Sequence, residues 1–256
     1  MAVRSVDTET TAQAAPLLSP EELRAQFQVV GEERYHHQHP FHLLMHEGKL
    51  SRGQLQAWAL NRYYYQSHIP MKDAAILSRS QDREFRAAWR KRIVDHDGER
   101  GHEGGIERWI HLAEATGLSR ERVVNAREVL PAVRYAVDAY LDLVKNRTLL
   151  EAVASSLTEL FSRDLIALRM DALRKHYPWL AGGLDYFTAR LDQAPEDARF
   201  AFDYVAEHAH TRAEQEAAVA ALTSKCDILW AQLDAVHFAY VQPAWPPPGA
   251  FVPEEE

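Results

Sequence analysis

The sequence is poor in cysteine, in basic charge and in long apolar runs, and each shortage excludes a class of protein. Cys226 is the one cysteine, so a framework of disulfides within the chain is excluded and a reducing compartment is expected. The net charge of −8 argues against the basic surface that nucleic-acid binding requires. No stretch reaches the roughly 18 consecutive apolar residues of a membrane helix.

A secretory signal is also missing, because the first residues, MAVRSVDTETTAQAA, contain no apolar core. We therefore expect a cytoplasmic protein with neither a nucleic-acid nor a membrane partner. Apolar residues make up 46% of the chain and charged residues 26%, which is typical of an ordinary globular domain.

Common catalytic and metal-binding signatures are absent as well. The chain has no P-loop, G-x-G-x-x-G, H-E-x-x-H or nucleophile elbow. E-x-x-H occurs at Glu33/His36 and Glu99/His102, but a di-iron bundle needs two such pairs on continuous helices. The glycines of DHDGERGHEGG would interrupt a helix at the second pair. We expect no metal site and assign the histidines around Pro40 to the core or the surface.

Organisation along the chain predicts one all-α domain between two tails. Residues 1–18 predict a flexible N-terminal tail, and the proline-rich, acidic residues 242–256 a second tail. Apolar residues recur at helical spacing over 19–241 with no sustained alternation, which predicts a single helical bundle.

Helix starts are marked throughout this domain. Ser19 and Ser51 are each followed three residues later by Glu or Gln, the pattern of a capping box. Further starts are expected near Arg83, Gly105, Ser119, Pro131, Thr148, Gly183 and Pro195. The helices from Thr148 and Pro195 are each expected to cross the whole domain.

Polar side chains interrupt the apolar faces of several expected helices. At 100° per residue, Arg62, Tyr65 and Gln66 share an otherwise apolar face. Further interruptions, identified by i, i+3 and i, i+4 spacing, are Arg92, His96, Tyr186, Arg190 and Lys225. Thr158 and Arg169 are three helical turns apart and would also share a face.

These embedded cations predict an anionic ligand. A single arginine in an apolar stripe usually snorkels or forms half of a buried ion pair. Several together need several anions, because an unpaired buried cation costs several kcal/mol. Asp95, Asp97, Glu159 and Asp227 could supply some of these anions within the protein. The remaining cations predict a cavity for a ligand with several carboxylates.

His96 has two interpretations. It closes an apolar stripe just before Gly98, between Asp95 and Asp97. A neighbouring carboxylate could orient it as a catalytic base, or it could be a histidine that caps a helix C-terminus.

A series of stretches, in order and spacing, resembles one family. They are RYHHQHPFHLLMHEG, NRYYYQSHIPMKDAAI, RIVDHDGERGHEGGIERW, AVDAYL, SSLTELF, HYPW, YFTARL and KCDILWAQLDA. They cover about residues 19 to 241, and several are long and unusual. They resemble the pyrroloquinoline-quinone synthase family, the cofactorless oxidases that complete pyrroloquinoline quinone (PQQ).

The resemblance implies a heme-oxygenase-like fold, a homodimer, and catalysis with neither metal nor organic cofactor. The implied reaction is ring closure and eight-electron oxidation of a reduced, tricarboxylated bicyclic precursor by O₂, with release of H₂O₂. Both this substrate and the product PQQ are polyanions, as the embedded cations require.

The resemblance also implies roles for individual residues. His96 would be the general base, and Tyr186, Arg190 and Lys225 would stabilise developing superoxide or peroxide charge. Substrate contacts are implied for Tyr35, His36, Arg62, Gln66, Lys72, Arg92, Tyr140, Thr158 and Arg169. The arginines among them offer bidentate geometry to carboxylates.

One position departs from the family pattern. The family usually carries a histidine three residues before the arginine matched by Arg169, and this chain has Ile166 there. Either another group takes over that histidine's role, with Tyr186 the candidate, or late oxidation is slow.

Two other functions would use similar residues. One is a metal- or heme-dependent oxidase or oxygenase of the same fold acting on another polyanion. The other is a non-catalytic carrier of the finished quinone. Metal content and O₂ consumption would separate the three.

Overall fold

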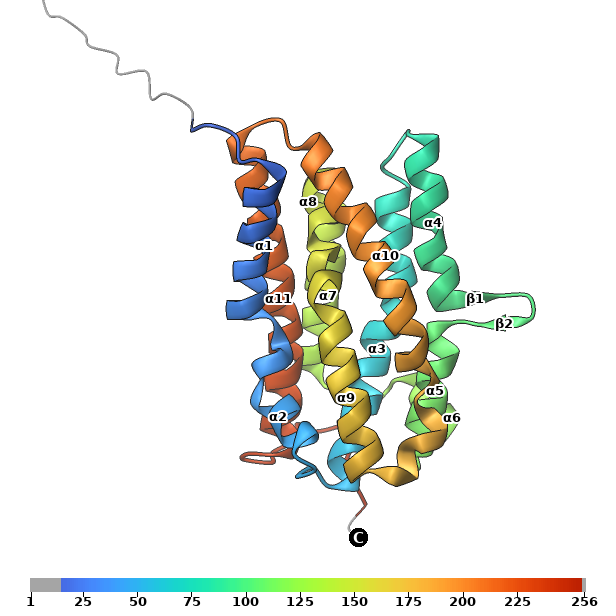
Figure 1. Cartoon of the computed structure of the whole chain (residues 1–256). Coiled ribbons are helices and arrows are strands. Elements are labelled where there is room, and N and C mark those ends of the chain that lie inside the picture. The colour runs from blue at the N-terminus through green and yellow to red at the C-terminus, as the bar shows by residue number, and fades with distance from the viewer. Residues whose placement is uncertain (1–14, 255–256) are drawn as a thin grey trace, which may run out of the picture.

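The computed structural model describes residues 15–254, and these form a helical bundle (Figure 1). The α-helices are α1 (Pro20–Arg34), α2 (Pro40–His46), α3 (Arg52–Leu77), α4 (Arg83–Asp97), α5 (Gly105–Ala115), α6 (Arg120–Asn125), α7 (Pro131–Asn146), α8 (Leu149–Ala154), α9 (Ser162–His176), α10 (Asp185–His208) and α11 (Arg212–Tyr240). Short 3₁₀ segments lie at His36–Gln38, Ser155–Phe161 and Pro178–Gly183. The prediction of an all-α fold is confirmed.

Local sequence signals explain where most of these helices begin. Ser19 and Ser51 form complete capping boxes, as predicted, and Thr148 forms a third. The predicted starts at Arg83 and Pro131 are the first residues of α4 and α7. Capping chemistry therefore fixes the helix starts even where the helix interior is polar.

Two predictions about long helices are wrong. Pro195 does not begin a helix but lies inside α10. The helix expected from Thr148 ends at Ala154, and a 3₁₀ segment separates it from α9. The register that placed Thr158 and Arg169 on one face assumed a continuous α-helix, which this stretch does not form.

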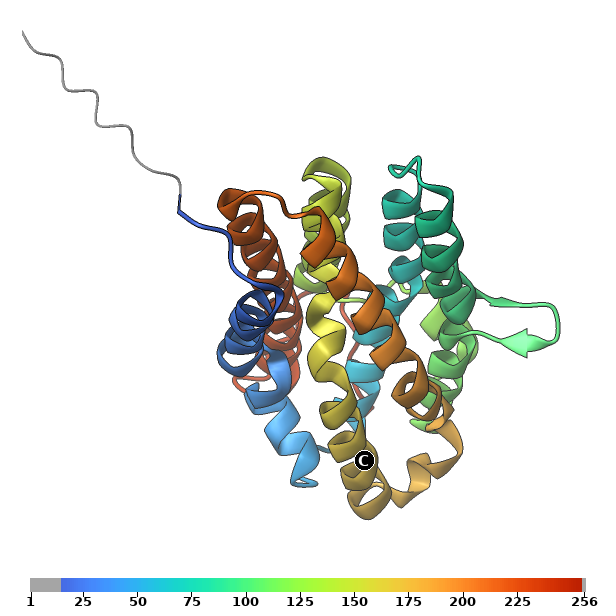
Figure 2. The same cartoon turned by 45° about the horizontal axis from the view of Figure 1, so that its top comes forward.

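Two long helices organise the bundle. α3 packs against α4, α5 and α7, while α11 packs against α1, α7 and α8. In Figures 1 and 2, α1 and α11 form one side of the bundle and α4 with its hairpin forms the opposite side. The 3₁₀ segment Ser155–Phe161 contacts both α10 and α11, so an irregular backbone lies at the centre of the helical frame.

A short β-hairpin follows α4 and projects from the bundle (Figure 2). It pairs β1 (Gly98–Glu99) with β2 (His102–Glu103). Gly98 has a φ of 81°, a conformation that favours glycine, and a Cβ on Gly104 would lie 2.3 Å from the carbonyl oxygen of His96. These glycines end α4 sharply at the turn that contains His96.

The described ends of the chain pack on the bundle. Phe251 is buried, its N–H donates to the Glu128 carbonyl, and Arg122 lies over its ring. The Leu18 N–H donates to the Gln215 side chain. Residues 1–14, which hold most of the predicted N-terminal tail and the region searched for a secretory signal, lie outside the described residues, as do 255–256. Within 15–254, no helix has the length and hydropathy to cross a membrane.

Candidate functional site

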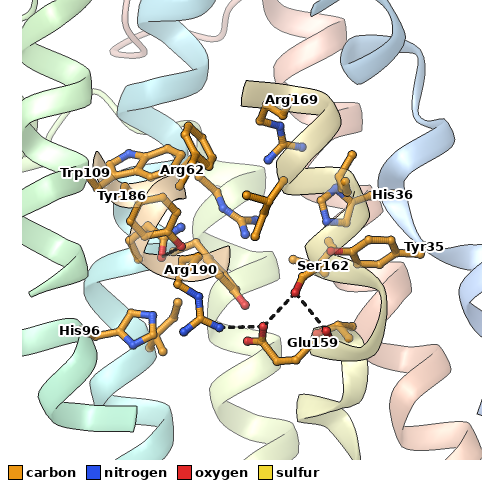
Figure 3. A pocket seen from close by; sticks show the side chains of 18 residues that line it. Tyr35, His36, Arg62, His96, Trp109, Glu159, Ser162, Arg169, Tyr186 and Arg190 are labelled. Carbon is orange, nitrogen blue, oxygen red and sulfur yellow. Dashed lines mark hydrogen bonds and ion pairs between the residues drawn. The ribbon is translucent and has the colours of Figure 1, made fainter. Parts of the chain in front are cut away.

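A cavity of about 80 Å³ lies between α3, α9 and α10, near the 3₁₀ segment Ser155–Phe161 (Figure 3). Its walls combine aromatic, aliphatic and charged side chains from segments far apart in the sequence. The lining residues are Tyr35, His36, Arg62, Tyr65, Gln66, Ile69, His96, Trp109, Thr158, Glu159, Ser162, Leu165, Ile166, Arg169, Tyr186, Phe187, Arg190 and Leu229.

Most of the predicted site residues meet at this cavity. Those that line it are Tyr35, His36, Arg62, Gln66, His96, Thr158, Arg169, Tyr186 and Arg190. Lys72, Arg92, Tyr140 and Lys225 do not line it. They lie behind the wall, where Lys225 contacts the lining residue Tyr65 and Arg92 contacts the lining residue Glu159.

Arg92 and Arg190 share a pair of buried carboxylates. The Nη2 of Arg190 lies 2.7 Å from an Oε2 oxygen of Glu159, and its Nη1 lies 3.2 Å from Oδ2 of Asp197. Arg92 approaches the other oxygens, at 3.6 Å from Glu159 Oε1 and 3.2 Å from Asp197 Oδ1. Although burial opposes ionisation of Glu159, both arginines hold its pKa at about 2.

The network extends to a third ion pair. Lys72 pairs with Asp73, whose Oδ1 also lies 3.5 Å from Nε of Arg92. The charges of Lys72, Arg92 and Arg190 thus match those of Asp73, Glu159 and Asp197 one for one. We call these six residues the paired network. It is neutral as a whole, so its cations need no ligand.

Three other cations have no such partner. Among residues 15–254, Arg62, Arg169 and Lys225 form no ion pair with a carboxylate. The guanidinium of Arg62 stacks on the ring of Tyr65 at 4.1 Å. Figure 3 shows the Arg62 and Arg169 guanidiniums extending into the same space. We call these three residues the unpaired cluster.

Burial of Arg169 and Lys225 makes this cluster unfavourable without an anion. Burial, followed by the positive charges of Arg62 and Lys72, lowers the pKa of Lys225 well below its ordinary value. Its Nζ lies 2.7 Å from the Tyr65 hydroxyl and 3.4 Å from the centre of the Tyr140 ring. Burial also lowers the pKa of Arg169 to about 10. An anion entering the cavity would relieve both effects.

His96 has the protonation pattern of a base. Its Nδ1 lies 2.9 Å from the carbonyl oxygen of Arg92, and because a carbonyl only accepts, Nδ1 carries the proton. The lone pair of Nε2 is then free. Burial, with a contribution from Arg190, lowers the pKa of His96 to about 4, so the ring is neutral near pH 7.

Other lining side chains hold the polar groups in place. The Tyr186 hydroxyl donates to Oε1 of Gln66 at 3.1 Å, and the Tyr186 ring packs edge-on to Trp109. Ile166 is 8% exposed and contributes an apolar patch to the cavity wall. The wall at this position therefore has no group that transfers protons.

The carboxylates were only partly predicted. Of the four proposed internal partners, Glu159 joins the paired network. Asp227 instead pairs with Arg34 at the surface. Asp95 and Asp97 form no ion pair in the described chain, and burial raises the pKa of both.

Sequence reasoning missed Asp73 and Asp197. Asp197 lies seven residues after Arg190, which is two helical turns and the same face of α10. Asp73 directly follows Lys72 in the polar centre of α3. Both signals were visible in the sequence.

Neither E-x-x-H pair assembles a metal site with other ligands in residues 15–254. The structure instead brings Glu103, Glu107 and His111 together, with ligand atoms within 4.8 Å of one another. Arg120 engages Glu107 through two hydrogen bonds. This group is a surface ion-pair cluster away from the cavity.

The model of the TENA/THI-4/PQQC family matches residues 24–235. The chain belongs to this family. The pyrroloquinoline-quinone synthase of Acidiphilium cryptum (strain JF-5) is 58% identical over 236 residues, covering 92% of this chain and 96% of that protein. The synthase of Xanthomonas campestris pv. campestris (strain 8004) is 54% identical, covering 94% and 96%. The predicted resemblance, and with it the prediction of an enzyme, is confirmed.

A third relative is longer. The bifunctional coenzyme PQQ synthesis protein C/D of Methylorubrum extorquens is 54% identical over 93% of this chain, but the match covers only 64% of that protein. This chain therefore corresponds to one part of that longer protein.

Solved structures confirm the fold at much lower sequence identity. A domain from Shewanella denitrificans with a heme-oxygenase-like fold has a TM-score of 0.71 and 13% identity, covering 91% of this chain and 96% of that one. A TenA homologue from Pseudomonas syringae has a TM-score of 0.69 and 13% identity, covering 89% and 99%. The predicted heme-oxygenase-like fold is confirmed.

Proposed function

We propose that this chain completes pyrroloquinoline quinone, by ring closure and eight-electron oxidation of a reduced, tricarboxylated bicyclic precursor with O₂ and release of H₂O₂. The observation that carries the proposal is the unpaired cluster of Arg62, Arg169 and Lys225. Arg169 and Lys225 are buried and Arg62 is half-buried; such a group of cations without carboxylates favours an anionic ligand, and a tricarboxylate supplies three negative charges. The relatives named pyrroloquinoline-quinone synthase support this choice of polyanion.

Binding would use the unpaired cluster rather than the paired network. Arg62 and Arg169 would bind carboxylates directly, and the bound anion would favour the charged form of Lys225. A cavity of about 80 Å³ is smaller than the roughly 300–1,000 Å³ typical of ligand pockets. Lining side chains such as Arg62 would therefore have to withdraw as the ligand enters.

Chemistry would begin with proton removal by His96. Its Nε2 is free to accept a proton from a ring carbon or oxygen of the substrate, while the Arg92 carbonyl fixes the ring through Nδ1. The deprotonated, electron-rich substrate would then pass electrons to O₂. Arg190 and Tyr186, at the cavity wall, would stabilise the reduced oxygen species.

We propose further that the reaction needs neither metal nor organic cofactor and that the protein is a homodimer. The test is anaerobic mixing with the reduced precursor, followed by O₂ addition, product spectroscopy and an assay for H₂O₂. Activity should survive dialysis against a strong chelator. Loss of activity that iron or manganese restores would favour a metal-dependent enzyme, and binding without O₂ consumption would favour a carrier.

A further inference from the structure

A series of close contacts connects the unpaired cluster to a histidine outside the cavity wall. Nη2 of Arg169 lies 3.0 Å from Nε2 and 3.3 Å from Nδ1 of His42. The Nδ1 of His42 lies 2.9 Å from the carbonyl oxygen of His36. His42 is 2% exposed and does not line the cavity, so its contact with a ligand would be indirect.

The hydrogen bonds define how His42 is protonated. A carbonyl only accepts, so Nδ1 of His42 donates to His36. Nη2 of Arg169 lies close to both ring nitrogens, so it contacts the face of the neutral ring and not the in-plane lone pair of Nε2. The Nδ1–H bond to His36 fixes the ring, and the ring face lies against Arg169.

Arg169 has little else to hold it. Its Nε is buried with no hydrogen-bond partner among the described residues, and no carboxylate pairs with it. The rings of Trp58 and Phe187 lie 5.9 and 5.8 Å from its guanidinium carbon and restrict it without hydrogen bonds. His42 is thus the polar partner that orients this cation.

We propose that His42 is a positioning residue, which holds the guanidinium of Arg169 toward the cavity so that it can bind an anionic group of the ligand. The inference rests on the proposed function for the identity of that ligand. A neutral ring suits this role, because a carboxylate in its place would neutralise Arg169 and weaken its attraction for the ligand.

The test compares four proteins with PQQ as the probe. His42→Leu keeps a buried side chain but removes the planar ring, and it should weaken PQQ binding about fivefold, the effect of one contact between a cation and a ring. His42→Phe keeps a planar ring at this position and should retain most of the affinity. His46→Leu is the matched control, since His46 stacks beside His42 and its buried Nε2 has no hydrogen-bond partner in the described chain.

A double mutant separates positioning from general packing. In an Arg169→Ala background, His42→Leu should cause no further loss of PQQ affinity, because the group that His42 orients is gone. Purely structural damage would instead add to the loss caused by Arg169→Ala. Thermal unfolding of each variant confirms that the compared proteins are folded.

The outcomes distinguish this inference from the proposed function. If the unmodified protein fails to bind PQQ, the proposed function is wrong. If it binds PQQ and His42→Leu binds equally well, or if His42→Phe is as weak as His42→Leu, the positioning role is wrong. Retained affinity in His42→Phe with no loss in His46→Leu would establish it.

Discussion

The paired network and the unpaired cluster lie side by side in one bundle and use the same basic residue types, yet their electrostatics are opposite. In the network, Arg92 and Arg190 each contact two carboxylates. In the cluster, Arg62, Arg169 and Lys225 contact aromatic rings, a hydroxyl and a histidine. The first arrangement stabilises the fold by itself, whereas the second is complete only with an anion. A buried arginine therefore indicates a ligand site only when the structure shows that no carboxylate pairs with it.

His96 lies where the two regions meet, and its replacement has the largest expected effect. His96→Asn should lower kcat by about two to four orders of magnitude, the usual contribution of a general acid or base. PQQ affinity should change little, because the cations remain. Single-turnover O₂ consumption and an equilibrium PQQ titration measure the two quantities. Near-normal turnover would make His96 only a helix cap.

Breaking the paired network should affect folding more than binding. Asp197→Ala leaves Arg92 and Arg190 with one shared carboxylate, and removing one partner of a buried pair costs about 3–5 kcal/mol of unfolding free energy. The control is Asp227→Ala at the exposed pair with Arg34, where at most about 1 kcal/mol is expected. Urea unfolding measures both, and equal losses would contradict the distinction.

Acid should act on His96 and on the paired network in different pH ranges. The pKa of His96 is about 4 in the folded protein and about 6.5 when unfolded. The unfolded chain therefore binds more protons, and unfolding free energy falls by up to about 3 kcal/mol as the pH drops from 6.5 to 4. The pKa of Glu159 is about 2 in the folded protein. The stability that its ionised form contributes is therefore lost only as the pH falls below about 4.5.

His96→Asn provides the control for this pH dependence. It should make the stability profile between pH 6.5 and 4 less steep and leave the loss at lower pH unchanged. Part of the slope should remain, because burial also lowers the pKa values of His36, His42 and His46. Urea unfolding across this range measures the profile. An unchanged slope above pH 4 would show that His96 does not titrate as described.

Removing a cation from the unpaired cluster should affect PQQ binding more than folding. Arg62→Ala should weaken PQQ binding by about 1.5 to 3 kcal/mol, typical of a charged hydrogen bond. Its unfolding free energy should fall far less than that of Asp197→Ala, because Arg62 has no carboxylate partner to leave behind. Calorimetric titration measures the PQQ affinity, and urea unfolding measures the free energy of unfolding. Unchanged PQQ affinity in a folded variant would show that Arg62 does not bind the ligand.

Ile166→His should give the smallest effect. PQQ binding should stay nearly unchanged, while the rate or pH dependence of O₂ consumption changes, because histidine can donate a proton at the cavity wall and isoleucine cannot. The folding cost should be small at a polar wall and about 1 to 3 kcal/mol in a dry core. Strong destabilisation with unaltered oxidation kinetics would assign Ile166 to packing alone.

Helix starts and embedded cations could be predicted because each is a local signal. The capping boxes at Ser19 and Ser51 and the polar face of Arg62 and Gln66 can be read within a few residues of sequence. The pairs Lys72–Asp73 and Arg190–Asp197 are also local, because each lies within one helix. The contacts of Arg92 with Asp73, Glu159 and Asp197 could not be predicted in the same way, because only the packed bundle brings these separate segments together. His42 was missed because its partner, Arg169, is 127 residues away.

The 3₁₀ segment Ser155–Phe161 changes the direction in which the following helix, α9, presents its side chains. A 3₁₀ helix advances about 120° per residue rather than 100°, so its seven residues rotate the following helix by roughly 140° relative to a continuous α-helix. One stretch of chain can then present Glu159 to the paired network and Arg169 to the ligand. A single inserted or deleted residue here would rotate α9 without altering any of its side chains, and would turn Arg169 away from His42.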